Sequence, residues 1–342
     1  MMGNKLDATE AVVRWGISRS VWRFGVLLIF AFLVALGCFL SLTKGSSQIT
    51  LQQITDILLQ PSEEPQSMII WNIRMPRTIV GALVGMNLSL AGAILQAVMR
   101  NPLADPHIIG ISSGAGLAGV AIMILYPELE FLLTPVAFVG AMLAAVIIYI
   151  LAWKNGIKPV RIILAGVAVS AFLGAGISGL MIFFSDRVHG ALMWMVGGLA
   201  ARSWPHVQII LPYAIIGLIL ALCASAYLNV LQLGDEMARG LGVNVEVTRI
   251  LCTALAALLA ASSVSVVGLL GFVGLIVPHA ARLLVGSDYR FLLPAAALLG
   301  AATVTLSDTF ARVILAPVEL PVGIIMAFLG APFFLFLLRR EI

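Results

Sequence analysis

Charged side chains are scarce in this sequence. Only 11% of its 342 residues are Asp, Glu, Lys or Arg, whereas 61% are hydrophobic, and an average soluble domain carries about 25% charged residues. So little polar surface cannot face water on all sides, which excludes a soluble globular protein. No polar interval is long enough for a separate catalytic domain. We therefore expect a single transmembrane permease domain over residues 1–342.

Cysteines and catalytic motifs are also few. Cys38, Cys223 and Cys252 each lie alone in an apolar run, which excludes a disulfide framework and a cysteine metal site. The sequence contains no glycine-rich phosphate loop ending in Lys-Ser or Lys-Thr and no His-Glu-x-x-His. We therefore expect this chain to be no enzyme and to bind no metal or cofactor itself. Its basic residues form no stripe with aromatics, which argues against nucleic-acid binding.

Long apolar runs are what the sequence has instead. Ten of them lie near residues 21–43, 78–99, 107–126, 134–153, 160–184, 205–228, 249–267, 270–279, 291–312 and 321–338. Most approach or exceed the roughly 20 residues that a helix needs to cross a bilayer. They are continuous, unlike the alternating segments of a β-barrel. The runs predict an all-α integral membrane protein with about ten transmembrane helices.

Two segments depart from simple spans. The run 270–279 is too short to cross a bilayer alone, and Gly268, Gly271 and Pro278 surround it. We expect it to begin or end in a buried loop that lines a cavity, with Pro278 ending the helix. The glycine-rich stretch 188–202 predicts a short re-entrant or surface helix on the outer side.

Basic residues indicate the orientation of the spans. With a cytoplasmic N-terminus, the inside segments hold Arg14, Arg19, Arg23, Arg100, Lys154, Lys158, Arg161, Arg239, Arg249, Arg282, Arg290, Arg339 and Arg340. This is the positive-inside pattern. It predicts a multi-pass protein with both termini in the cytoplasm.

Five motifs follow one another from about residue 70 to the C-terminus. They are Arg74-Met-Pro-Arg77, Arg100-Asn-Pro-Leu-Ala-Asp-Pro106, Gly110-Ile-Ser-Ser-Gly-Ala-Gly116, Gly271-Phe-Val-Gly-Leu-Ile-Val-Pro-His-Ala-Ala-Arg282 and Glu319-Leu-Pro-Val-Gly323. Together they resemble the FecCD/BtuC-like permease family of ABC importers, which take up iron siderophores, haem and cobalamin. The resemblance implies a type II ABC importer permease fold in the bacterial cytoplasmic membrane.

The resemblance also implies partners and a cargo. The expected partners are two copies of an ATP-binding subunit that uses ATP and Mg, an extracytoplasmic substrate-binding protein, and a second permease subunit, identical or related. An iron-siderophore complex is the expected cargo because it is frequent in the family, and haem and cobalamin stay open. An ion-coupled secondary transporter is the other alternative, although few acids lie deep enough for ion binding at mid-membrane.

At the outer surface, the resemblance implies that Arg74, Arg77 and Arg312 dock acidic residues of the binding protein. Planar, bidentate guanidinium groups suit this use. The alternative is that these arginines reach lipid phosphates or pair inside the chain with Asp308 or Glu319.

At the inner surface, the polar segment at about 231–248 resembles the family's coupling loop, which receives force from the ATPase. Its expected contact residues are Gly234, Glu236, Ala238, Arg239, Gly240 and Gly242. The family resemblance also implies a cytoplasmic gate at Asn101, Pro102 and Leu103 and at Pro159 and Val160. For the prolines, simple helix termination is the alternative.

Overall fold

The described part of the chain is built from helices. The computed structural model describes residues 18–45, 49–59, 64–107, 110–154 and 159–341. Its elements are α2 (Arg19–Thr43), α3 (Leu51–Leu59), α4 (Pro65–Met68), the π-helix η1 (Ile69–Arg74), α5 (Met75–Met99), α6 (Ile111–Leu125), η2 (Pro127–Leu132), α7 (Leu133–Ala152), α8 (Pro159–Phe183), η3 (Ser185–Arg187), α9 (Val188–Val196), α10 (Trp204–Gln232), α11 (Asp235–Gly240), α12 (Val245–Val267), α13 (Val273–Val285), α14 (Tyr289–Val313) and α15 (Val322–Glu341).

Apolar helices occupy the positions of all ten predicted runs. Within the described residues, seven helices are long and apolar enough to cross a membrane, and three shorter apolar helices, Ile111–Leu125, Val273–Val285 and Val322–Phe336, accompany them. The prediction of an all-α protein with about ten spans is confirmed. A short helix, α9, also lies in the stretch 188–202 where one was expected.

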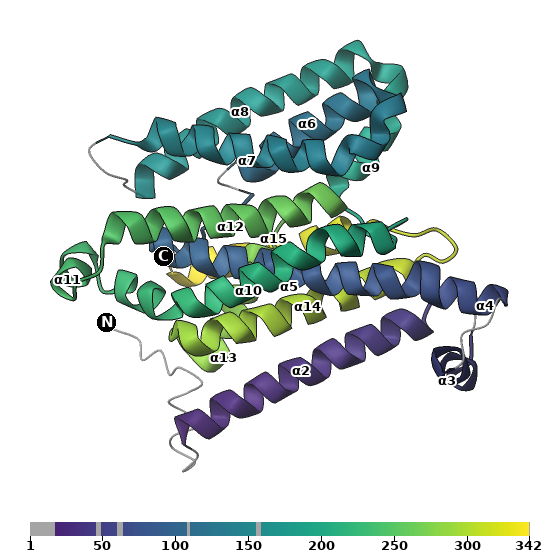
Figure 1. Ribbon diagram of the computed structural model, residues 1–342, viewed down its shortest axis with the longest axis horizontal. Helices are drawn as coiled ribbons and strands as arrows, with labels where there is room; N and C mark the ends of the chain where they lie inside the picture. The colour runs from purple at the N-terminus through teal and green to yellow at the C-terminus, as the bar shows by residue number, and fades with distance from the viewer. Residues whose placement is uncertain (1–17, 46–48, 60–63, 108–109, 155–158, 342) are drawn as a thin grey trace.

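The helices are arranged around α5 (Figure 1). It packs against α14, α10, α12 and α13, while α2 lies along α14 on one flank and α6, α7 and α8 form a group on the other. In the most apolar stretch of the spans containing α5 and α12, 78% of the residues are buried. The corresponding share is only 22% in α2, α7, α8 and α10. The outer helices therefore present apolar faces suited to lipid or to another membrane subunit.

The segments with predicted roles lie at opposite ends of this bundle. α11 lies at one end, with the first turn of α2 and the last turns of α13 and α15 (Figure 1). α3, α4 and the connection from α14 to α15 lie at the other end. We call these the α11 end and the α4 end.

Glycines allow the central helices to touch through their backbones. A Cβ atom on Gly92 of α5 would lie 1.9 Å from the carbonyl oxygen of Gly274 in α13, and one on Gly85 would lie 2.1 Å from the carbonyl oxygen of Gly300 in α14. Real Cβ atoms do not approach so closely, so only glycine fits these positions. This is the small-residue packing typical of membrane helices.

Gly92→Ala is therefore expected to destabilise the fold, because the added methyl group would push apart α5 and α13. We expect a loss of about 1–3 kcal/mol, seen as a lower midpoint of thermal unfolding in detergent. Gly25→Ala in α2 is the matched control, because no described atom outside its own stretch of helix lies within 4 Å of a Cβ placed there. Equal unfolding midpoints for the two variants would contradict the close packing.

Two sequence expectations are corrected by the structure, one about Pro278 and one about where the second span begins. Pro278 does not end its helix, because α13 continues to Val285, and the Arg74–Arg77 motif lies within a continuous helical span, Pro65–Met99, rather than outside it. In α13 the carbonyl of Gly274, which would receive the missing N–H of Pro278, accepts instead from the Gln96 side chain at 3.3 Å.

Pro76, in the Arg74–Arg77 motif, is accommodated by the π-helix η1 that precedes it. Its wider turn gives i to i−5 bonds, as from the N–H of Met75 to the carbonyl of Ile70. Pro76 can make no such bond to the carbonyl of Trp71, and the indole N–H of Trp204 donates to that carbonyl at 2.9 Å. Side chains from other helices thus satisfy the carbonyls left by both prolines.

Candidate functional site

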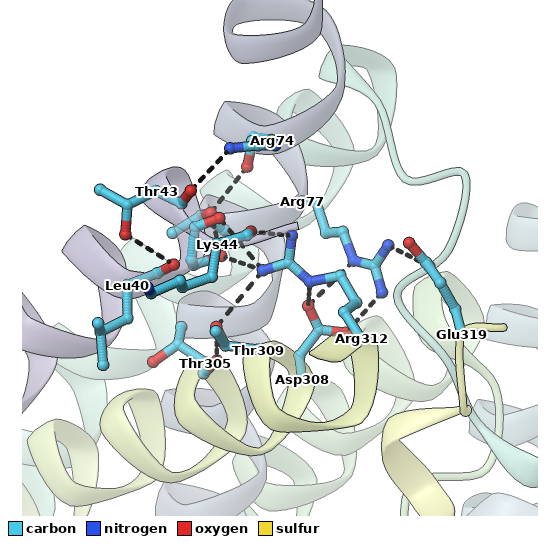
Figure 2. Close-up of polar contacts among 12 residues, drawn as sticks. Leu40, Thr43, Lys44, Arg74, Arg77, Thr305, Asp308, Thr309, Arg312 and Glu319 are labelled. Carbon is cyan, nitrogen blue, oxygen red and sulfur yellow. Dashed lines mark hydrogen bonds and ion pairs between the residues drawn. The ribbon is translucent and has the colours of Figure 1, made fainter. Parts of the chain in front are cut away.

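A compact cluster of charges lies at the α4 end, between α5, α14 and the connection to α15 (Figure 2). Arg77 donates from Nε and Nη2 to the two carboxylate oxygens of Asp308, at 3.0 and 2.9 Å, and from Nη1 to Glu319 Oε2 at 2.7 Å. Asp308 is 2% exposed and Arg77 is 6% exposed. A bidentate, buried pair of this kind fixes the relative position of α5 and α14.

The other two arginines of the cluster connect it to the end of α2. Arg312 lies one turn after Asp308, with 3.3 Å between its Nε and the carboxylate, and its Nη2 donates to Ser41 Oγ at 2.9 Å. Arg74 donates from Nη1 to the carbonyls of Leu42 and Thr43 at 2.6 and 3.2 Å. Carbonyls in the last turn of a helix lack intrahelical partners, and arginine satisfies them here.

The structure therefore brings Arg74, Arg77 and Arg312 together, as the sequence predicted, but it places them inside the protein. All three are at most 6% exposed. Pairing of arginines with Asp308 and Glu319, named above as the alternative, is the arrangement observed. Docking of a binding protein by these arginines stays a prediction, and in this conformation it would require their side chains to exchange internal partners for external ones.

At the opposite end, α11 displays a mixed polar and apolar surface. Glu236, Arg239 and Gly240 are exposed, and Met237 and Leu241 are 58% and 59% exposed. Ala238 is fully buried against the bundle. Gly234 and Gly242 flank the helix with φ of +105° and +81°, a backbone region that favours glycine, so they set the sharp entry and exit of the segment.

Asp235, which the sequence analysis did not single out, joins α11 to the bundle. Its carboxylate forms ion pairs with Arg100, at the end of α5, and with Arg249 of α12, whose Nη1 and Nη2 lie 3.0 and 2.8 Å from the two oxygens. Arg249 is 3% exposed. One feature of the sequence could have pointed to Asp235. It is an acid at the first position of a short helix, and arginines lie at the ends of two neighbouring spans.

The expected gate residues lie in two places. Asn101, Pro102 and Leu103 form a half-buried turn directly after Arg100, and Asn101 Oδ1 accepts from the backbone N–H of Leu103 at 2.9 Å. Pro159 begins α8, and Val160 is 66% exposed on its first turn. No hydrogen bond or ion pair between described residues joins the two places. Lys158, which precedes Pro159, lies outside the described residues.

A large hollow lies between the end of α9, the loop before α13 and α15. Its volume is about 970 Å³, and it is lined by Asp105, His107, Met195, Val196, Leu269, Gly271, Phe272, Leu275, Gly323, Ile324, Ala327, Phe328, Ala331, Pro332 and Phe334. The loop before α13 contributes to this lining, which confirms the prediction that the short eighth segment begins in a cavity-lining loop. Burial raises the pKa of the Asp105 carboxyl, and His107 opposes this shift. Most of the side chains that line the hollow are apolar, and Asp105 is the one acid among them.

Comparison with known proteins matches almost the whole chain. The sequence pattern of the FecCD transport family matches residues 32–340. The Fe(3+)-citrate import system permease protein YfmD of Bacillus subtilis is 39% identical over 94% of this chain and 96% of its own length. The hemin transport system permease protein HmuU of Yersinia pestis is 39% identical over 93% of this chain and 95% of its own length.

Two further comparisons cover most of the chain. The cobalamin import system permease protein BtuC of Halobacterium salinarum is 45% identical over 82% of this chain and 76% of its own length. A solved structure described as an inward-facing conformation of a metal-chelate type ABC transporter superposes with a TM-score of 0.82 at 29% identity, covering 92% of this chain and 99% of that one.

Proposed function

Because the chain belongs to the FecCD transport family, we propose that it is the permease subunit of an ATP-driven importer whose cargo is a ferric siderophore or a similar ferric chelate. The observation that supports this most directly is the presence of both a large hollow and a short exposed helix, α11, at one end of the bundle. A hollow alone could serve any transporter. A short exposed helix tied to the bundle by ion pairs suits a subunit that receives movement from a partner.

The proposed partner at α11 is an ATP-binding subunit. Met237 and Leu241 offer apolar contact area, and Glu236 and Arg239 offer charges of both signs. Such a small apolar patch with polar neighbours is typical of protein interfaces. Because both termini of the bundle also lie toward this end, we propose that it faces the cytoplasm.

The proposed partner at the α4 end is a substrate-binding protein. Three arginines and two carboxylates form the cluster there, and Arg202 lies close enough for the charge of Arg77 to lower its pKa, in addition to the larger lowering by burial. This excess of positive charge would attract an acidic surface. The arginines are buried, and the exposed member of the cluster is Glu319, whose side chain is 40% exposed. The proposed contact therefore requires the arginines to exchange Glu319 and Asp308 for acids of the partner.

A second permease subunit is proposed to pack against α8. Outside its own stretch of helix, no described atom lies within 4 Å of a Cβ placed on Gly174 or Gly179, and Phe172, Ile182 and Phe183 are 74–84% exposed. Small residues beside large apolar ones allow two membrane helices to approach closely. Whether the second subunit is identical or related does not follow from this surface.

The cargo is tested by uptake into vesicles that contain the chain with an ATP-binding subunit and a binding protein encoded beside it. We expect ATP-dependent uptake of radioactive iron as a ferric chelate, and competition among ferric citrate, a ferric hydroxamate, haem and cobalamin identifies the cargo class. Uptake of haem or cobalamin without uptake of any ferric chelate would contradict the proposed cargo.

Gly240→Trp is expected to weaken assembly with the ATP-binding subunit. Gly240 is exposed on α11, and no described atom outside its own stretch of helix lies within 4 Å of a Cβ added there, so an indole would obstruct the partner without disturbing the fold. We expect co-purification of the two subunits to fall at least about fivefold, as for a central interface position. Gly25→Trp on α2, where the space is equally open, is the control. Normal assembly of Gly240→Trp would remove α11 from the interface.

A further inference from the structure

A second, smaller pocket lies at the α11 end, apart from the large hollow. Its volume is about 240 Å³, and it is lined by Gln96, Arg100, Asn101, Pro102, Gln232, Arg282 and Ser287. These residues come from the ends of α5, α10 and α13 and from the turn before α14. Two arginines and no acid line this pocket.

Arg282 carries a charge that no carboxylate in the described part of the chain balances. Its Nη2 donates to Gln96 Oε1 at 2.9 Å and to the hydroxyl of Tyr289 at 3.4 Å, and both acceptors are neutral. Its Nε and Nη1 make no hydrogen bond with described residues. A guanidinium has five N–H donors, so most of its donors remain available at the pocket.

Neighbouring bonds fix the direction of this guanidinium. Gln96 Nε2 donates to the carbonyls of Gly274 and Leu275, so Oε1 is turned toward Arg282. The Tyr289 hydroxyl also accepts from Gln232 Nε2 at 3.0 Å, and Tyr289 is fully buried. A charged donor held in place before a ligand arrives loses little entropy on binding.

The surrounding charges leave the pocket positive. Asp235 is shared between Arg100 and Arg249. Asp288, next to Ser287, accepts from the side-chain amide of Asn229 and lies 3.9 Å from Arg23. Neither acid forms an ion pair with Arg282.

We propose that this pocket binds a phosphate group, supplied either by an anionic phospholipid or by inorganic phosphate. Arg100 and Arg282 would hold the phosphate oxygens, since guanidinium groups bind phosphate through paired N–H bonds. The Ser287 hydroxyl and the Asn101 amide nitrogen, which is left free to donate because Asn101 Oδ1 accepts from Leu103, add neutral donors. Basic pockets between helices at the cytoplasmic surface commonly bind lipid head groups.

The pocket adjoins the predicted gate, so a bound phosphate would also affect that segment. Asn101 and Pro102 line it and also belong to the predicted gate. A phosphate bridging Arg100 and Arg282 would join the turn after α5 to the end of α13, and so restrain that segment. The binding itself does not depend on the proposed transport function.

The test uses the purified full chain. One arm measures phospholipid retained by the protein in native mass spectrometry after reconstitution with phosphatidylglycerol or with phosphatidylcholine alone. The other arm titrates inorganic phosphate into lipid-exchanged protein by calorimetry. We expect one of the two probes to bind, and Arg282→Gln to weaken that binding about tenfold to a hundredfold, the usual effect of losing charged hydrogen bonds.

Arg290→Gln is the control, because Arg290 is an exposed arginine at the same end with no ion pair among described residues, and it should bind as the unchanged chain does. If Arg282→Gln fails to fold, Ser287→Asp at the exposed rim should abolish binding by repulsion. Absence of binding by both probes, or equal binding by the unchanged chain and a folded Arg282→Gln or Ser287→Asp variant, would overturn the proposal.

Discussion

Asp308→Asn is expected to lower the free energy of unfolding by about 3–5 kcal/mol, the usual effect of breaking a buried ion pair. Asp308 is 2% exposed and pairs with both Arg77 and Arg312. An asparagine would keep the shape but remove the charge, and its amide hydrogens would face N–H donors of Arg77. Thermal unfolding in detergent, followed by tryptophan fluorescence, measures the loss.

Asp186→Asn is the matched control for this prediction. Asp186 also pairs with an arginine, Arg187, at 3.7 Å, but its side chain is 77% exposed. Exposed pairs contribute about 0–1 kcal/mol, so little change is expected. If Asp308→Asn unfolded at the temperature of Asp186→Asn, the charge cluster would have no structural role, and its arginines would be available for docking alone.

Asp235→Asn is expected to uncouple ATP hydrolysis by the partner from substrate uptake. The carboxylate of Asp235 is the charged link between α11, the end of α5 at Arg100 and the buried Arg249 of α12. Arg100 directly precedes the turn Asn101–Leu103. Without this charge, movement of α11 would be transmitted only weakly to the predicted gate. We therefore expect uptake per ATP hydrolysed to fall at least about tenfold, as for a charge pair that couples by about 1.4 kcal/mol or more.

Two further variants test whether this result depends on the ion pairs of Asp235 with Arg100 and Arg249. Asp186→Asn removes another arginine-paired carboxylate, one that is 77% exposed and lies in η3 rather than in α11, and should leave the ratio unchanged. Asp235→Glu keeps the charge and should restore much of the coupling. An Asp235→Asn protein that folds, assembles with the ATP-binding subunit and transports normally per ATP would show that α11 acts through other contacts.

The sequence predicted the spans well because membrane burial leaves a local signal. Each helix has to satisfy its own backbone in lipid, so a long apolar run is almost sufficient to identify it. The positions of Arg74, Arg77 and Arg312 at one end also followed from counting spans. Pairing with Asp308 or Glu319 could be named only as an alternative to docking, since Arg77 and Asp308 lie 231 residues apart in the sequence and no local pattern decides between the two.

The prolines also show that a partner distant in the sequence cannot be predicted from a local pattern. Pro278 predicted an interruption because it removes a backbone N–H, and Pro76, inside the helical span Pro65–Met99, removes another. Both helices continue because Gln96 and Trp204, from other elements, supply donors to the carbonyls left over. Asp235 was missed for a related reason: its importance depends on Arg100 and Arg249, which only the folded chain brings to it.

The central claim, that this permease is driven through α11 by an ATP-binding partner, is tested most directly in vesicles. Uptake of a ferric chelate is measured with internal ATP and a proton uncoupler, and again with an imposed proton gradient and no ATP. The account predicts uptake only with ATP, insensitive to the uncoupler and abolished in Gly240→Trp. Uptake driven by the gradient without ATP would contradict it.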